Sequence, residues 1–107
     1  MFTRVVEVNS KPGKSHETAN AINEKVLPIL RQQVGFIDET VLTSETEPNQ
    51  VVALSFWKTK EDADRYQREQ FKKVTEILSN LIESSPVVRT FNVHTSTPHK
   101  IAAGKAA

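Results

Sequence analysis

The chain has 107 residues, which is enough for one domain with a single hydrophobic core but marginal for an isolated monomer. Its 14 basic and 13 acidic side chains leave a formal net charge of +1, without the basic stripe that nucleic-acid binding needs. Cysteine is absent, which excludes disulfides and thiolate nucleophiles. No stretch approaches ~18 consecutive apolar residues and the N-terminus lacks a signal-peptide pattern, so we expect a cytoplasmic protein with no membrane partner.

A strand and a long helix are predicted first. Phe2 to Asn9 alternates between two faces and is rich in β-branched residues, which is typical of a strand, and Lys11-Pro12-Gly13 ends it. A helix is expected from Lys14 to Val34, capped by Ser15 or Gly13 and terminated by Gly35, with a kink where Pro28 removes a hydrogen bond. Its apolar residues recur at helical spacing: Ala19, Ile22, Val26, Ile29 or Leu30, and Val34.

A β-hairpin follows. Phe36 to Glu45 alternates as a strand, the segment ETEPNQ has turn composition, and a second strand is expected from Val51 to Lys58. This second strand is apolar on both faces, with one face formed by Val51, Ala53 and Trp57 and the other by Val52, Leu54 and Phe56. Such a strand is either central in a layered sheet or covered by a partner.

The last third of the chain predicts a divided helical region and a fourth strand. Thr59 and Asp62 have the spacing of a capping box, so a helix should begin near Lys60, and a second apolar series begins at Phe71. Ser84-Ser85-Pro86 ends the helical region, and alternation returns over 87–95. Residues 96–107 have no apolar period and are expected to form a flexible C-terminal tail.

The order β-α-β-β-α-β predicts an α+β fold of the ferredoxin-like type over residues 1–95. Its antiparallel four-stranded sheet would carry the helices on one face. Because one helical layer cannot cover both apolar faces of the sheet, we expect a homodimer that pairs through the sheet faces.

The order of a strand, a PGK turn, LPILRQQVGF, SFWKTKEDADRYQ, Phe71 and VVRTFNV resembles the antibiotic biosynthesis monooxygenase (ABM) domain of the dimeric α+β barrel superfamily. The resemblance runs from about Val5 to Val93. It implies two protomers paired sheet to sheet, each with a pocket between its own helices and sheet.

The functional residues of the family carry over in part. Quinone-forming members have an Asn and a Trp four residues apart on the third strand; Trp57 takes the Trp place, but Ala53 stands at the Asn place. Haem-degrading relatives have an Asn on the first strand, a Trp on the following helix and a His further along. The corresponding positions here are Val6, Tyr66 and a stretch over 73–75 without His, which disfavours haem cleavage.

Three residues are candidates for catalysis. The indole N–H of Trp57 could hold a substrate oxygen, although a Trp at a strand end also fits a core position. Tyr66 could donate a hydrogen bond to a phenolate or peroxide, although it also suits the edge of the core. Arg89 could stabilise an anionic oxygen or form an ion pair at a dimer interface. The candidates for binding a small aromatic or apolar substrate are Phe36, Phe56, Phe71 and Phe91.

The three His residues share no ligand spacing, and only three Gly are present, so neither a metal site, a nucleotide loop nor another cofactor is expected. The leading hypothesis, which rests on the resemblance, is a cofactor-independent monooxygenase that oxidises a small phenol or hydroquinone. The alternative is a non-catalytic dimeric module that binds a small ligand, which Ala53 favours. An isomerase-like or signal-molecule processing role is a third option.

Overall fold

Four antiparallel strands form one sheet in the computed structural model, which describes residues 1–97. The strands are β1 (Phe2–Asn9), β2 (Phe36–Thr43), β3 (Gln50–Trp57) and β4 (Val87–Asn92). Their order across the sheet is β2-β3-β1-β4, so the first and third strands are central. This arrangement confirms the predicted ferredoxin-like α+β fold. Strand β2 ends two residues earlier, and β4 three residues earlier, than the sequence pattern predicted.

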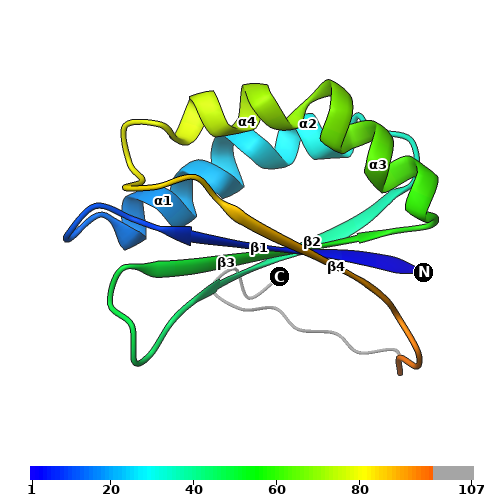
Figure 1. Ribbon diagram of the computed structural model, residues 1–107, viewed down its shortest axis with the longest axis horizontal. Coiled ribbons are helices and arrows are strands. Elements are labelled where there is room, and N and C mark those ends of the chain that lie inside the picture. The colour runs from blue at the N-terminus through cyan, green and yellow to red at the C-terminus, as the bar shows by residue number, and fades with distance from the viewer. Residues whose placement is uncertain (98–107) are drawn as a thin grey trace.

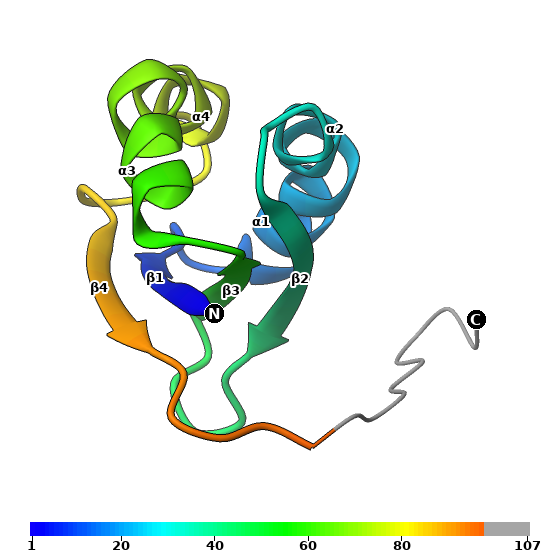
Figure 2. The ribbon, with the colours of Figure 1, turned by 90° about the vertical axis from the view of Figure 1, so that its right-hand side faces the viewer.

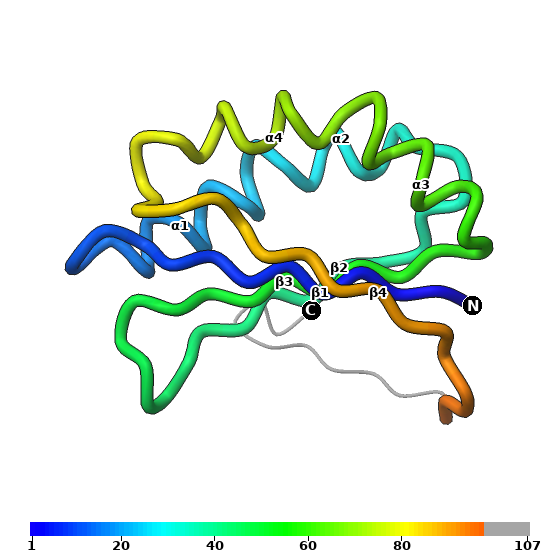
Figure 3. The backbone as a smooth tube through the Cα atoms, in the orientation of Figure 1, coloured from blue at the N-terminus to red at the C-terminus, as the bar shows by residue number. Residues whose placement is uncertain are grey.

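The helices lie on one face of the sheet (Figures 1 and 2). The first helical segment consists of α1 (Ser15–Ala21), a π-helical turn η1 (Ile22–Val26) and α2 (Leu27–Arg31). The second consists of α3 (Lys60–Glu69) and α4 (Phe71–Leu78). Figure 2 shows α1 and α2 on the side of β2, and α3 and α4 on the side of β4. Figure 3 shows the backbone coiling from α1 into α2, and from α3 into α4.

The π-helical turn explains how Pro28 fits into the first helical segment. Proline lacks the N–H that a helix interior needs, but at the first positions of a helix this donor is not required. The wider turn η1 ends at Val26, so that Pro28 falls at the start of α2. The predicted single helix to Val34 is therefore wrong at its end: α2 stops at Arg31, and Val34 is 71% exposed rather than part of the inner face.

Gly35 lies in the connection between α2 and β2, next to the start of α3. Its φ of +84° confirms the predicted left-handed terminator. A Cβ at this position would lie only 2.1 Å from a carboxylate oxygen of Asp62 in α3, so a larger residue would force the Asp62 side chain to move. The Gly35 carbonyl accepts a hydrogen bond of 2.8 Å from the N–H of Lys58, which holds the start of β2 against the end of β3.

Thr59 of the predicted capping box is the N-cap of α3. The Thr59 hydroxyl accepts a hydrogen bond of 3.1 Å from the N–H of Asp62, and the helix begins at Lys60 as expected. The predicted division of this helical region is confirmed as well, since Gln70 leaves helical geometry between α3 and α4. Together the two helices bury four apolar side chains against the sheet: Ala63, Tyr66, Val74 and Leu78.

The strand register divides the side chains of the sheet between two faces. On the face toward the helices, β1 and β3 place Arg4 opposite Ser55 and Val6 opposite Ala53. The other face has no helical layer. It exposes Leu42 by 46% and Phe91 by 50%. Apolar side chains in contact with water on this scale support the expected sheet-to-sheet partner, which remains a prediction.

Candidate functional site

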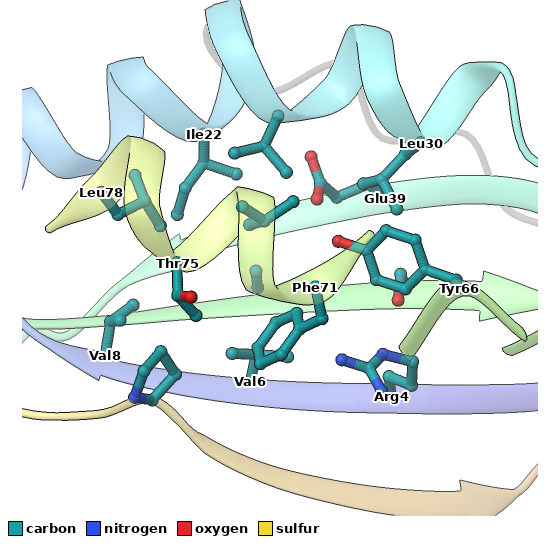
Figure 4. Close-up of a pocket in the computed structure, with 15 residues that line it drawn as sticks. Arg4, Val6, Val8, Ile22, Leu30, Glu39, Tyr66, Phe71, Thr75 and Leu78 are labelled. Carbon is teal, nitrogen blue, oxygen red and sulfur yellow. The ribbon is translucent and has the colours of Figure 1, made fainter. Parts of the chain in front are cut away.

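A mostly apolar cavity lies between the helix-facing side of the sheet and the two helical segments (Figure 4). The space in which the centre of a water molecule can move inside this cavity is about 40 Å³. Its apolar wall includes Val6, Val8, Ile22, Leu30, Phe71 and Leu78. Five polar side chains also line it: Arg4, Glu39, Ser55, Tyr66 and Thr75. Apolar surroundings with a few polar groups are typical of a site for a small organic ligand.

Arg4 is a buried cation in the wall of this cavity. Its side chain occupies an inward position of β1 and is only 3% exposed. One nitrogen, Nη1, donates a hydrogen bond of 2.6 Å to Oε1 of Gln67 in α3. The guanidinium carbon lies 5.2 Å from the ring centre of Tyr66 and 4.9 Å from that of Phe71, which are cation–π distances. Within residues 1–97, neither Nε nor Nη2 has a hydrogen-bond partner.

Burial lowers the pKa of Arg4, while the charges of Tyr66 and Asp64 act in the opposite direction. A guanidinium nevertheless stays protonated in proteins. The wall of the cavity therefore carries a permanent positive charge. Two nitrogens of this guanidinium, Nε and Nη2, have no hydrogen-bond acceptor in the described part of the chain.

Glu39 brings a carboxyl group to the cavity from β2. A bulge between Phe36 and Asp38 shifts the register, so that Glu39 pairs with Ser55 and shares the helix-facing side with Phe36. Burial raises the pKa of Glu39 to about 7, because the charged form loses contact with water. No basic side chain of residues 1–97 forms an ion pair with it. A carboxyl group with a pKa near neutrality can both accept and return a proton at physiological pH.

Tyr66 stands between these two charged groups. Burial raises its pKa to about 12; the Arg4 charge lowers this pKa and the Glu39 charge raises it. The hydroxyl therefore stays protonated at neutral pH and can donate a hydrogen bond. Figure 4 shows this hydroxyl pointing into the cavity, with the Glu39 carboxyl group nearer the first helical segment and the Arg4 guanidinium nearer β1.

The structure brings four of the predicted site residues together in one aromatic row. Ring centres are 5.7 Å apart for Phe36 and Trp57, 5.2 Å for Trp57 and Tyr66, and 6.3 Å for Tyr66 and Phe71. Only Tyr66 and Phe71 line the cavity. Trp57 is 0% exposed, and its indole N–H donates a hydrogen bond of 2.9 Å to the Ser55 hydroxyl. Trp57 is therefore a core residue that packs against Tyr66 and forms a hydrogen bond with Ser55.

The other three predicted site residues lie on the opposite face of the sheet. The register places Phe56 and Phe91 on either side of Thr3, and Arg89 beside Val5. The Arg89 guanidinium forms an ion pair with Glu7 of the same chain. These residues do not line the cavity, so the sequence-based grouping of Phe56, Arg89 and Phe91 with Trp57 and Tyr66 requires correction. The reason is the period of two in a strand, which sends neighbouring side chains to opposite faces.

Arg4, Glu39 and Ser55 were missed in the sequence. Arg4 carried a usable signal, because it shares the strand face of Phe2, Val6 and Val8, where a charged residue is unexpected. Glu39 carried no such signal, since its inward position depends on the bulge.

Among residues 1–97 no three His, Cys, Asp or Glu side chains gather in a way that could hold a metal ion. No helix in this part of the chain is long and apolar enough to cross a membrane.

The model of the family described as "Antibiotic biosynthesis monooxygenase" (ABM) matches residues 1–77. The chain therefore belongs to this family, as the sequence motifs predicted. Among curated proteins no match was found.

Solved structures of low sequence identity share the fold. A protein of unknown function from Nitrosomonas europaea, NE2512, is 14% identical with a TM-score of 0.75, over 92% of this chain and 94% of its own. SnoaB, a cofactor-independent oxygenase from Streptomyces nogalater, is 18% identical with a TM-score of 0.73, over 92% of this chain and 97% of its own. The monooxygenase from the ActVA-Orf6 gene of Streptomyces coelicolor, solved with the ligand nanaomycin D, is 18% identical with a TM-score of 0.74, over 92% of both chains.

Proposed function

We propose that this protein is a monooxygenase that oxidises a small electron-rich phenol in the cavity, with the substrate anion itself as the reductant of O₂. The observation that carries the proposal is the Glu39 carboxyl group, whose pKa is raised to about 7 by burial in a cavity that also holds the Tyr66 hydroxyl. Membership of the monooxygenase family and the fold shared with SnoaB support the same reaction class.

The first step is removal of the phenolic proton. Glu39 accepts this proton, because a base with a pKa near the working pH is both deprotonated in part and basic enough to act. The resulting phenolate accepts a hydrogen bond from Tyr66, whose ring lies beside the buried Arg4 cation. In an apolar cavity these interactions are stronger than in water.

The second step transfers electrons from the phenolate to O₂. A C–O bond forms at the unsubstituted ring carbon opposite the phenolic oxygen, and the proton held by Glu39 passes to the terminal oxygen to give a hydroperoxide. The O–O bond then breaks as that carbon loses its hydrogen, which yields a quinone and one water. One oxygen atom of O₂ enters the product and the other leaves in water, so the balance requires no further reductant.

A second candidate function is a non-catalytic dimeric module that binds a small aromatic or apolar ligand. Two observations favour it. Ala53 stands at the position of the family's pocket Asn, opposite Val6 in the register. The Trp57 N–H is already engaged with Ser55 and does not face a ligand.

Oxygen consumption by the purified protein tests the monooxygenase proposal. A panel of phenols and hydroquinones is supplied without added flavin or metal, and quinone formation is followed by absorbance. We expect uptake by the wild type and a loss of about 10²-fold or more in Glu39→Gln. The matched control is Glu47→Gln, which removes an exposed carboxylate in the β2–β3 turn and should leave the rate unchanged. Absence of uptake with every phenol, combined with a ligand-dependent change in Trp57 fluorescence, would favour the binding module.

A further inference from the structure

We infer that Arg4 forms a carboxylate-binding subsite, so that the ligand of the cavity is an aromatic acid. The inference rests on the proposed function only in taking this cavity as the substrate site. It specifies a substrate class: a ring whose phenolic hydroxyl lies toward Glu39 and Tyr66 and whose ionised carboxylate lies on Arg4.

The unsatisfied nitrogens of Arg4 form one edge of the guanidinium. Nη1 is committed to Gln67, which leaves Nε and Nη2 without an acceptor in the described part of the chain. These two nitrogens lie side by side, and their N–H bonds point in parallel. A carboxylate bridges such a pair with two parallel hydrogen bonds, which is the geometry that distinguishes Arg from Lys.

The charge of Arg4 is also uncompensated. Its side chain is 3% exposed, and no carboxylate of residues 1–97 forms an ion pair with it. Asp64, the acidic residue whose charge acts on Arg4, forms its ion pair with Lys60 at 2.7 Å. A buried cation without a counter-ion is costly, and the cost falls when a ligand supplies the opposite charge. A carboxylate satisfies both the charge and the two nitrogens at once.

The cavity adjoins an open groove along α4, and we take this groove as the entry, since Nε and Nη2 are themselves buried. Phe71, Thr75 and Pro86 line the cavity, and the same three residues line an open groove between α4 and the segment leading to β4. The Phe71 ring contacts the Arg4 guanidinium at 4.9 Å, so it lies both at this opening and on the proposed subsite. An aromatic acid that enters here meets the rings of Phe71 and Tyr66, on which its own ring can stack.

Binding of benzoate and benzamide tests the subsite without requiring turnover. The two molecules have nearly the same shape, but only benzoate is charged. Binding is measured by calorimetry and by fluorescence of Trp57, whose ring centre lies 5.2 Å from that of Tyr66. The titration is done near pH 6, where Glu39, with a pKa of about 7, is mostly neutral and does not repel the anion. We expect the wild type to bind benzoate about tenfold or more tightly than benzamide.

Three variants locate the effect. Arg4→Met should abolish the preference for benzoate, and Arg4→Lys should reduce it because the charge remains but the paired donors are lost. Arg89→Gln removes an Arg from the opposite face of the sheet and should keep the preference. Thermal melting checks that each variant folds. If Arg4→Met does not fold, the inference is tested by Arg4→Lys and by the wild-type comparison of benzoate with benzamide. Equal binding of benzoate and benzamide by the wild type, or an unchanged preference in a folded Arg4 variant, would overturn the inference. Neither result depends on oxygen uptake, so the subsite and the monooxygenase proposal can fail separately.

Discussion

Replacing Glu39 with Gln keeps the size of the side chain but removes its titration, which should change how the stability of the fold depends on pH. Burial raises the pKa of Glu39 from its ordinary value of 4.5 to about 7 in the folded chain. Between these two values the folded protein retains a proton that the unfolded chain has released. The free energy of unfolding of the wild type therefore falls as pH rises through this window and levels off above about pH 7.

The magnitude follows from the width of the window. Each pH unit between the two pKa values lowers the free energy of unfolding by about 1.4 kcal/mol. The interval from 4.5 to about 7 therefore corresponds to about 3 kcal/mol. Glu39 keeps some contact with water, which reduces the expected value to about 2 kcal/mol. In Glu39→Gln this fall should be absent. The variant should gain about 2 kcal/mol relative to the wild type on going from about pH 5 to about pH 8.

Urea denaturation at these two pH values measures the effect, with protein concentration held constant because a dimer makes stability concentration-dependent. Glu47→Gln is the control, since Glu47 is exposed and should leave the pH dependence of the wild type intact. If the free energies of unfolding of the wild type and Glu39→Gln remain parallel from pH 5 to pH 8, Glu39 does not titrate as a buried group. Its proposed role as the base would then lose its physical basis.

Two further predictions concern the hydroxyl of Tyr66 and the open face of the sheet. Tyr66→Phe removes one hydrogen-bond donor and little volume, so it should leave the melting temperature unchanged but lower turnover by about two or three powers of ten. Equal turnover in the wild type and Tyr66→Phe would remove Tyr66 from the mechanism. Light scattering at micromolar concentration should give the mass of a dimer that buries well over ~1,000 Å². Leu54→Lys, which charges the face without helices, should shift the mass toward one chain, whereas a wild-type mass of one chain would refute the sheet-to-sheet dimer.

Much of the fold could be predicted because its signals are local. Alternation over 2–9 and 51–57 predicted β1 and β3, since a period of two is a property of the strand itself. Thr59 predicted the start of α3, and Gly35 predicted the left-handed end of the first helical segment, because each depends on a few neighbouring residues. The sequence also named Trp57, Tyr66 and Phe71 as site residues; their rings lie in one row, but only Tyr66 and Phe71 line the cavity.

The chemistry of the cavity was decided by tertiary structure. Glu39 faces inward because of a bulge in β2, and its pKa is raised because helices from elsewhere in the chain exclude water from it. The Trp57 N–H appeared free in the sequence, yet Ser55 occupies it. Arg89 was a candidate for the site and Arg4 was not, although only Arg4 lies on the face that the helices cover. A residue's type and its strand are properties of the local sequence, whereas its face, its burial and its partners depend on segments distant along the chain, and these determine what its charge or hydroxyl can do.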